Sequence, residues 1–261
     1  QAAYTGQDQA NVTTWLPLVT NEGTHRTRIA VQNTAVHSAS ATIRYYDGTG
    51  NLAASDVLAL APHGSALVDP ELPGSPTGPP SGFQGSAVVS SDWPLVVTAY
   101  ELDPQMGSDA YNGEGQGYQH AVYMPSVRNY GPDGTPTIFV QNPCCAAALV
   151  TIAYYNLAGA QVASQTLSLP AYGSAAVDPQ AVLGGGFDGS AIITSDQFPA
   201  AVMRSVTTSG AVHTTELYAG TQNPDQRLHF PIVHRPNADG SGQETTFSVQ
   251  NVSPDSPITV W

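Results

Sequence analysis

The stretch Ile29-Ala30-Val31-Gln32-Asn33 decides the fold, because the chain contains a version of it three times. It returns as Ile138-Phe139-Val140-Gln141-Asn142 and as Phe247-Ser248-Val249-Gln250-Asn251, with successive glutamines 109 positions apart. In the first copy, Ile29 and Val31 are expected to face one side of a strand, with Ala30 and Gln32 on the other. Self-similarity at a fixed interval indicates a repeated structural unit.

Other elements recur around this motif and define the extent of the unit. The apolar pair before Pro17 has counterparts before Pro125 and Pro231, and the Gly-Ser-Ala sequence that ends at Ala87 returns at Ala191. The second half of the unit appears only twice. The sequence therefore predicts two complete repeats and a partial third that holds only first strands. The predicted units are 1–107, 108–216 and 217–261.

Each complete unit holds about seven short strand candidates separated by turn residues. Seven antiparallel strands in roughly 100 residues is the count of an immunoglobulin-like domain. The expected fold is all-β, with two tandem immunoglobulin-like β-sandwich repeats and an incomplete third. The Asn that closes each copy of the motif is interpreted structurally, because its side chain can hydrogen-bond nearby backbone and end a strand. The seven strand candidates of the first unit lie near 12–19, 26–33, 41–47, 55–61, 64–69, 84–91 and 94–102.

The charge inventory excludes several classes of function. The seven basic residues are all Arg, and twenty acids give a net charge of −13. A surface this acidic repels phosphate, which argues against nucleic-acid partners and anionic membranes. The absence of Lys excludes Schiff-base chemistry and a P-loop. Runs of apolar residues are too short for a membrane span.

No motif in the sequence nominates a catalytic centre, so we expect a protein that is not an enzyme. The histidines are scattered, and the sequence contains no Gly-x-Ser-x-Gly nucleophile turn. Cofactors are not expected, although two segments have a weak resemblance to calcium sites. Asp47 to Asn51 is better explained as a hairpin turn, and the acids between the units could fold around an ion. Those acids are Asp103, Asp109 and Glu114.

Two further features leave alternatives open. The adjacent Cys144 and Cys145 are either small apolar loop residues or a strained vicinal disulfide, which would close almost no loop. The sequons at Asn11 and Asn251 are candidate glycosylation sites if the protein is secreted.

The second unit carries the clearest resemblance to a known kind of protein, through Met124-Pro-Ser-Val-Arg-Asn-Tyr130 and Thr137-Ile-Phe-Val-Gln-Asn142. With the aromatic-Leu-Pro-Leu-Val and Gly-Phe-x-Gly-Ser-Ala elements, the chain resembles secreted tandem-repeat β-sandwich surface proteins of filamentous, often thermophilic bacteria. The resemblance covers nearly the whole chain. It implies an extracellular or cell-surface location and β-sandwich repeats, and it transfers no catalytic residue.

The leading hypothesis is a structural subunit of an extracellular filament or surface layer that assembles head to tail with copies of itself. Three strands in a third repeat would leave an open edge that another chain could pair with. The alternative is a carbohydrate-binding or adhesive module of a larger secreted protein, motivated by aromatics such as Trp93. The candidate polymerisation residues are Phe230, Ile232, Phe247, Val249, Ile258, Val260 and Trp261.

Overall fold

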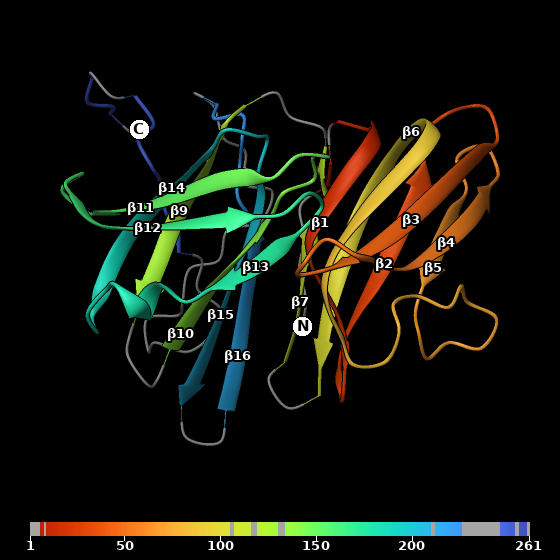
Figure 1. Cartoon of the computed structure of the whole chain (residues 1–261), viewed down its shortest axis with the longest axis horizontal. Helices are drawn as coiled ribbons and strands as arrows, with labels where there is room; N and C mark the ends of the chain where they lie inside the picture. The colour runs from red at the N-terminus through yellow and green to blue at the C-terminus, as the bar shows by residue number, and fades with distance from the viewer. Residues whose placement is uncertain are drawn as a thin grey trace, which may run out of the picture.

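The computed structural model describes residues 6–7, 9–104, 107–115, 119–129, 134–209, 212–225, 246–253 and 256–259. Two β-sandwiches lie side by side, the first drawn in red to yellow and the second in green to blue (Figure 1). Apart from one 3-10 turn, η1 (Pro179–Ala181), the described elements are strands. The all-β sandwich prediction is confirmed. The described residues form no helix long and apolar enough to cross a membrane.

The strands of both sandwiches follow one another in the same order along the chain. The first sandwich contains β1 (Asn11–Glu22), β2 (His25–Asn33), β3 (Ala39–Asp47), β4 (Leu52–Leu60), β5 (Ser65–Val68), β6 (Phe83–Asp103), β7 (Gly107–Asn112) and β8 (Glu114–Gly115). The second contains β9 (Ala121–Asn129), β10 (Gly134–Gln141), β11 (Ala148–Asn156), β12 (Gln161–Leu169), β13 (Ser174–Val177), β14 (Phe187–Ser195), β15 (Ala200–Ser209) and β16 (Val212–Ala219).

Each sandwich has two four-stranded layers. In the second they are β12-β11-β14-β9 and β13-β10-β15-β16. The first sandwich repeats this arrangement with one long strand, β6, in place of the separate β14 and β15. The first half of β6 pairs with β1 and β3, and its second half pairs with β2 and β7. β6 therefore joins both layers into one continuous sheet.

The strands β7 and β16 are additions to the seven strands expected in each unit. β7 pairs with β6, and β16 pairs with β15. The sequence of β7 is Gly-Ser-Asp-Ala-Tyr-Asn, in which only Ala110 and Tyr111 are apolar. Such a segment has no strand-like alternation, and only the neighbouring strand reveals its conformation.

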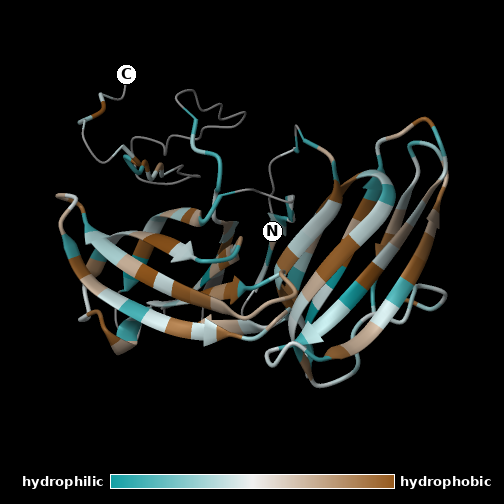
Figure 2. Cartoon of the chain, turned by 45° about the horizontal axis from the view of Figure 1, so that its top comes forward, coloured by the Kyte–Doolittle hydropathy of each residue, from teal (hydrophilic) through white to brown (hydrophobic). Residues whose placement is uncertain are grey.

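The alternation expected from the repeated motif is present in the structure. Ile29 and Val31 are buried in the first core, and Ile138 and Val140 in the second. Brown and pale residues alternate along the strands of both sandwiches (Figure 2). The first core does not end at its own sandwich, because Phe139, a residue of β10, belongs to it as well.

The Asn that ends each motif has the structural role that the sequence indicated. Asn33 Nδ2 donates to the carbonyl oxygens of His37 and Ala61, and its Oδ1 accepts from a backbone N–H two residues ahead. Asn142 makes the equivalent three hydrogen bonds in the second unit. The Asn side chain therefore organises the loop after the strand in both units.

A proline interrupts the first strand of each unit and creates an irregular point in the sheet. Pro17 has no N–H to donate, and the register between β1 and β6 shifts between Leu16 and Val19. The Tyr111 hydroxyl compensates by accepting from the Leu18 N–H and donating to its carbonyl oxygen.

The second unit repeats this device. Tyr218 makes the same pair of hydrogen bonds with Ser126, the residue after Pro125. The conserved geometry of the two tyrosines within one chain fixes how β7 and β16 align with the first strand of their units. Burial raises the pKa of the Tyr218 hydroxyl well above its ordinary value. The hydroxyl therefore keeps its proton and continues to donate to the Ser126 carbonyl oxygen.

The third unit differs from the prediction where it can be seen. Residues 246–253 and 256–259 form no strand, and residues 226–245 lie outside the described residues. A strand satisfies its backbone by pairing with a neighbour. Within the described ranges, no strand pairs with this segment.

Candidate functional site: the junction between the two sandwiches

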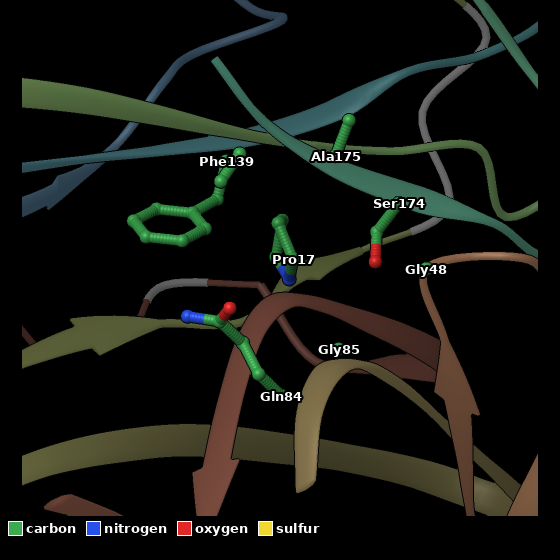
Figure 3. Close-up of a pocket in the computed structure, with 8 residues that line it drawn as sticks. Pro17, Gly48, Gln84, Gly85, Phe139, Ser174 and Ala175 are labelled. Carbon is green, nitrogen blue, oxygen red and sulfur yellow. The ribbon is translucent and has the colours of Figure 1, made fainter. Parts of the chain in front are cut away.

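The outer face of β10 and β15 in the second sandwich packs on the first sandwich, and β16 of the second sandwich lies beside β7 of the first. Successive side chains of β10 face opposite sides of the sheet. Ile138 and Val140 enter the second core, whereas Phe139 and Gln141 point outward. In Figure 3, Phe139 and Ser174 lie opposite Pro17, Gln84 and Gly48 of the first sandwich. Phe139 is 4% exposed and Gln141 is 0% exposed, so this face is fully covered.

A side-chain hydrogen bond connects the repeated Gln of the second unit to the first. Gln141 Nε2 donates to the carbonyl oxygen of Ala87 at 3.2 Å. Ala87 pairs with Leu16, immediately before the irregularity that Pro17 introduces. The Gln therefore reaches a backbone acceptor at a place where the ladder between β1 and β6 is irregular.

The β3–β4 hairpin of the first unit approaches the second unit closely. The Ser174 N–H donates to the Gly48 carbonyl oxygen at 3.3 Å, and Tyr46 stacks on Tyr172 with ring centroids 4.9 Å apart. A Cβ at Gly50 would lie 2.0 Å from the carbonyl oxygen of Ala171. Only glycine fits at Gly50, which also has a φ of +83°.

Apolar side chains from both units fill the space between these polar contacts. Trp15 and Val88 of the first unit form a small cluster with Ala200 of the second, and Phe198 packs against it. Val202 and Leu217 belong to the first core together with Phe139. The two sandwiches thus share buried surface continuously, which favours one relative orientation over a flexible linkage.

A buried acid and an arginine lie at one end of the junction. Both Glu101 oxygens accept hydrogen bonds from the hydroxyls of Thr20 and Thr27. Burial raises the pKa of Glu101 to about 7, opposed by those hydroxyls and by the positive charge of Arg204. Arg204 lies 5.0 Å from the centre of the Phe139 ring. The Glu101 carboxyl is 2% exposed and its oxygens are hydrogen-bonded, so it suits a structural role.

Glu114 occupies the segment that connects the two sandwiches. Its carboxylate accepts from the Ala201 N–H at 3.4 Å and from Gln222 Nε2 at 3.3 Å, both in the second unit. Its own backbone pairs with Trp15 in the first unit. Burial raises the pKa of Glu114 to about 8, and the two hydrogen bonds offset only part of that effect.

The acids that the sequence grouped as a candidate calcium segment have separate partners. Asp103 lies 3.5 Å from His25, and Asp109 accepts from the Leu217 N–H at 2.8 Å. Glu114 faces Ala201 and Gln222, as described above. No group of three or more His, Cys, Asp or Glu side chains suited to a metal ion occurs among the residues that the structure describes.

The other calcium-like segment is a turn, as the sequence indicated. Asp47 Oδ1 accepts from the Thr49 and Asn51 N–H groups, and the Thr49 hydroxyl lowers the pKa of Asp47 below its ordinary value. Asn156 makes the same turn in the second unit with Ala158 and Ala160. A carboxylate is therefore not required for this hairpin.

The third copy of the motif repeats the junction contact on the second sandwich. Gln250 Nε2 donates to the Ala191 carbonyl oxygen at 3.3 Å, and Ala191 is the counterpart of Ala87. Asn251 Oδ1 accepts from the Ser253 N–H, two residues ahead, as in the complete units. Among the candidate polymerisation residues, Phe247, Val249 and Ile258 are exposed by 43%, 47% and 51%. Phe230, Ile232, Val260 and Trp261 lie outside the described residues.

The remaining candidate residues lie away from the junction's centre. Trp93 is 39% exposed and its ring lies 4.7 Å from that of His37. Asn11 is partly buried beside Gly115, whereas Asn251 is exposed and its amide donates to the Ser256 carbonyl oxygen. Cys144 and Cys145 are both free thiols, and Cys145 is exposed.

Sequence reasoning missed the role of the repeated Gln. The pair Gln-Asn was interpreted as a strand end, which describes Asn33 and Asn142 correctly but leaves the Gln unexplained. A signal was present, because a Gln recurs in all three motif copies at an outward position of the alternation. An outward polar residue repeated in this way indicates a contact beyond its own unit.

Comparisons with known proteins add little to this description. No protein-family model matches the chain, and no curated protein matches it. One similar solved structure is described as "Crystal Structure of Thermotoga maritima 1070". It has a TM-score of 0.38 and 8% identity, covering 41% of this chain and 97% of that one. This degree of likeness carries no functional argument.

Proposed function

We propose that this protein is a structural subunit of an extracellular filament or surface layer, in which β-sandwich units follow one another head to tail. The observation that carries the proposal is the repeated junction contact. Gln141 binds the Ala87 carbonyl oxygen and Gln250 binds the Ala191 carbonyl oxygen, so the same connection is used twice along one chain. A contact that is reused from unit to unit suits a protein whose purpose is to extend an array.

The composition of the junction supports the same proposal. Its buried groups are engaged in positioning one sandwich on the other: Gln141 and Glu114 hold backbone groups, and Gly50 allows close approach. The resemblance to secreted repeat proteins supports an extracellular location. Copies of the same chain are the proposed partners.

Two assembly routes are compatible with this function. In the first, a strand from a neighbouring subunit pairs with the third-unit segment, as the sequence suggested. In the second, sandwiches of different subunits stack through the faces that form the internal junction. Residues 246–253 favour assembly in the first route, because they are the template for the incoming strand. They oppose assembly in the second route, because they compete with a neighbouring subunit for the second sandwich.

Deleting residues 227–261 is the experiment that tests the proposal and separates the routes. Wild-type protein is expected to form filaments or sheets in negative-stain micrographs, and light scattering over a concentration series would report its mass. Strand pairing predicts that the deletion leaves monomers, because the template is gone. Face stacking predicts larger assemblies, because Ala191 becomes accessible. Monomers at every concentration, for the wild type and for the deletion alike, would refute the structural-subunit proposal.

A carbohydrate-binding or adhesive role is the second candidate, favoured by one observation. The Trp93 ring is partly exposed and lies over His37, an arrangement that presents an aromatic face to solvent. The corresponding aromatic of the second unit, Phe198, lies beside His120 but packs into the junction. An aromatic platform is thus available on the first unit.

If Trp93 binds sugars, Trp93→Ala is expected to abolish the signal of the chain on a glycan array, because ring stacking would supply most of the affinity. Leu149→Ala, at an exposed apolar residue of the second unit, serves as the control and should leave binding unchanged. Equal glycan binding by the wild type and Trp93→Ala would count against the lectin role.

A further inference from the structure

The first sandwich carries its own copy of the face that forms the internal junction. Gln32 is the counterpart of Gln141, and the pairing partners of β2 and β10 show that Val96 and Thr98 correspond to Ala200 and Val202. Gln141, Ala200 and Val202 are each 0% exposed because the first sandwich covers them. Gln32, in contrast, is exposed, and a shallow groove lies beside it, lined by Ala30, Gln32, Val96 and Thr98 among others.

The beginning of the described chain already makes a junction-type contact on this face. Gln7 Nε2 donates to the Val97 carbonyl oxygen at 2.6 Å. Gln7 is the counterpart of Glu114, which accepts from the Ala201 N–H. Val97 and Ala201 also correspond, because the Val97 carbonyl oxygen accepts from the Gly113 N–H and the Ala201 carbonyl oxygen accepts from the Gly220 N–H. The connecting segment thus follows the same path over the outer face of both units.

The opposite end of the molecule presents the matching surface. Ala191 lies in β14 beside the register shift that Pro125 introduces between β9 and β14, as Ala87 lies beside Pro17. Leu157, the counterpart of Gly48, is 82% exposed at this end. On the face around Gln32, Ala30 stands where the internal junction has Phe139. The large side chain of the contact would therefore be Leu157 on one copy, in place of Phe139 on the opposite face.

We infer that the outer face of β2 and β6 around Gln32 is a docking surface for the second sandwich of another copy of this chain, with Gln32 donating to the Ala191 carbonyl oxygen of that copy. The internal junction is the argument for this occupant, because it shows the same two faces in contact with the same hydrogen bond. The inference rests on the proposed structural function and names its interface.

The chain's own C-terminal segment competes for this contact. Gln250 already donates to the Ala191 carbonyl oxygen, so a second copy reaches that oxygen only when residues 246–253 leave it. Assembly therefore depends on the balance between Gln250 in the same chain and Gln32 of a neighbour.

Sedimentation velocity of the full-length chain over a concentration series tests this surface. Gln250→Ala is expected to lower the apparent dissociation constant for self-association by roughly five- to tenfold, because a competing hydrogen bond of about 1 kcal/mol is lost. Adding Gln32→Arg should return the protein to monomers, since docking would bury the longer, charged side chain without an opposite charge. Gln161→Arg, on the exposed strand β12, is the control and should change nothing.

A disulfide trap fixes the geometry in a background where Cys144 and Cys145 are replaced by Ser. Gly48 and Ser174 meet in the internal junction, so their counterparts Leu157 and Ser65 should meet between copies. Leu157→Cys with Ser65→Cys is expected to give crosslinked oligomers on oxidation. Moving the second cysteine to Gln161, with Leu157→Cys retained, should give none.

The outcomes separate the interface from the function. Assemblies that persist with Gln32→Arg and do not crosslink through Leu157 and Ser65 would overturn the interface and leave the structural role standing. Monomers for both the wild type and Gln250→Ala at every concentration would overturn both. Association that rises with Gln250→Ala and disappears with Gln32→Arg supports the interface.

Discussion

Gly50→Ala is expected to lower the stability of the protein more than the same substitution at any glycine that faces solvent. The new Cβ would lie 2.0 Å from the Ala171 carbonyl oxygen, a backbone atom that cannot rotate away. The hairpin and the second sandwich must separate to accommodate it, which weakens the Ser174–Gly48 hydrogen bond and the stacking of Tyr46 on Tyr172. Chemical denaturation should show the loss.

The chain provides a matched control at the equivalent position of the second unit. Gly159 has a φ of +79°, close to that of Gly50, and a Cβ there would meet nothing within 4 Å. Gly159→Ala is expected to cost about 1 kcal/mol for the left-handed backbone alone. Gly50→Ala should cost about 2 kcal/mol more, the range typical of overpacking. Equal losses for both variants would show that the hairpin contact does not constrain the junction.

Glu114→Gln is expected to make the protein more stable at pH 8 and to flatten its pH dependence. Burial at the junction raises the pKa of Glu114 to about 8 from an ordinary value near 4.5. Below pH 4.5 the carboxyl is protonated in both the folded and the unfolded chain, so its ionisation does not change the free energy of unfolding. Between those pH values the unfolded chain ionises freely while the folded one keeps the proton. The free energy of unfolding therefore falls as pH rises, by about 1.4 kcal/mol per pH unit, and becomes level above pH 8.

Glu101 contributes in the same direction over a shorter interval, because burial raises its pKa to about 7. Wild-type stability is therefore expected to fall between pH 4.5 and 7 through both acids, and between pH 7 and 8 through Glu114 alone. Glu114→Gln should retain the first decline in weakened form and lose the second. Gln supplies the same acceptor for the Ala201 N–H, and Gln7 occupies the corresponding position before the first unit.

Calorimetric melting temperatures measured from pH 5 to 9 would test this expectation. Glu216→Gln, at an exposed residue of β16, is the control and should leave the pH profile of the wild type unchanged. A Glu114→Gln profile parallel to the wild-type one across pH 7 to 8 would contradict the assignment of that decline to the junction carboxyl.

The repeat made much of the fold predictable from the sequence. Ile29 and Val31 alternate with Ala30 and Gln32, and this pattern alone places two residues in a core and two outside it. Asn33 also revealed its role, because a side chain that bonds backbone two and four residues ahead acts within its own loop. Local patterns of this kind depend on neighbours in the chain and can be recognised without a structure.

Strand β7 and the separate contacts of the candidate calcium acids could not be predicted from local patterns. Tyr111 lies in a polar, Gly-rich segment that becomes a strand because β6 offers it a backbone to pair with. Asp109 and Glu114 are close in sequence, yet their partners are Leu217 and Ala201, about 100 residues away. Proximity in sequence therefore suggested a shared ligand where folding gave each acid a separate contact.

The sequence by itself determined that this is an all-β protein of repeated sandwiches, because strand alternation and turn residues act over short distances and recur at a fixed interval. Only the tertiary structure decided that the repeated Gln connects one unit to the next. Gln141 and Ala87 meet because the bulge at Pro17 and the face of β10 are brought together across the junction. A hydrogen bond between residues 54 positions apart depends on that arrangement, which no local pattern encodes.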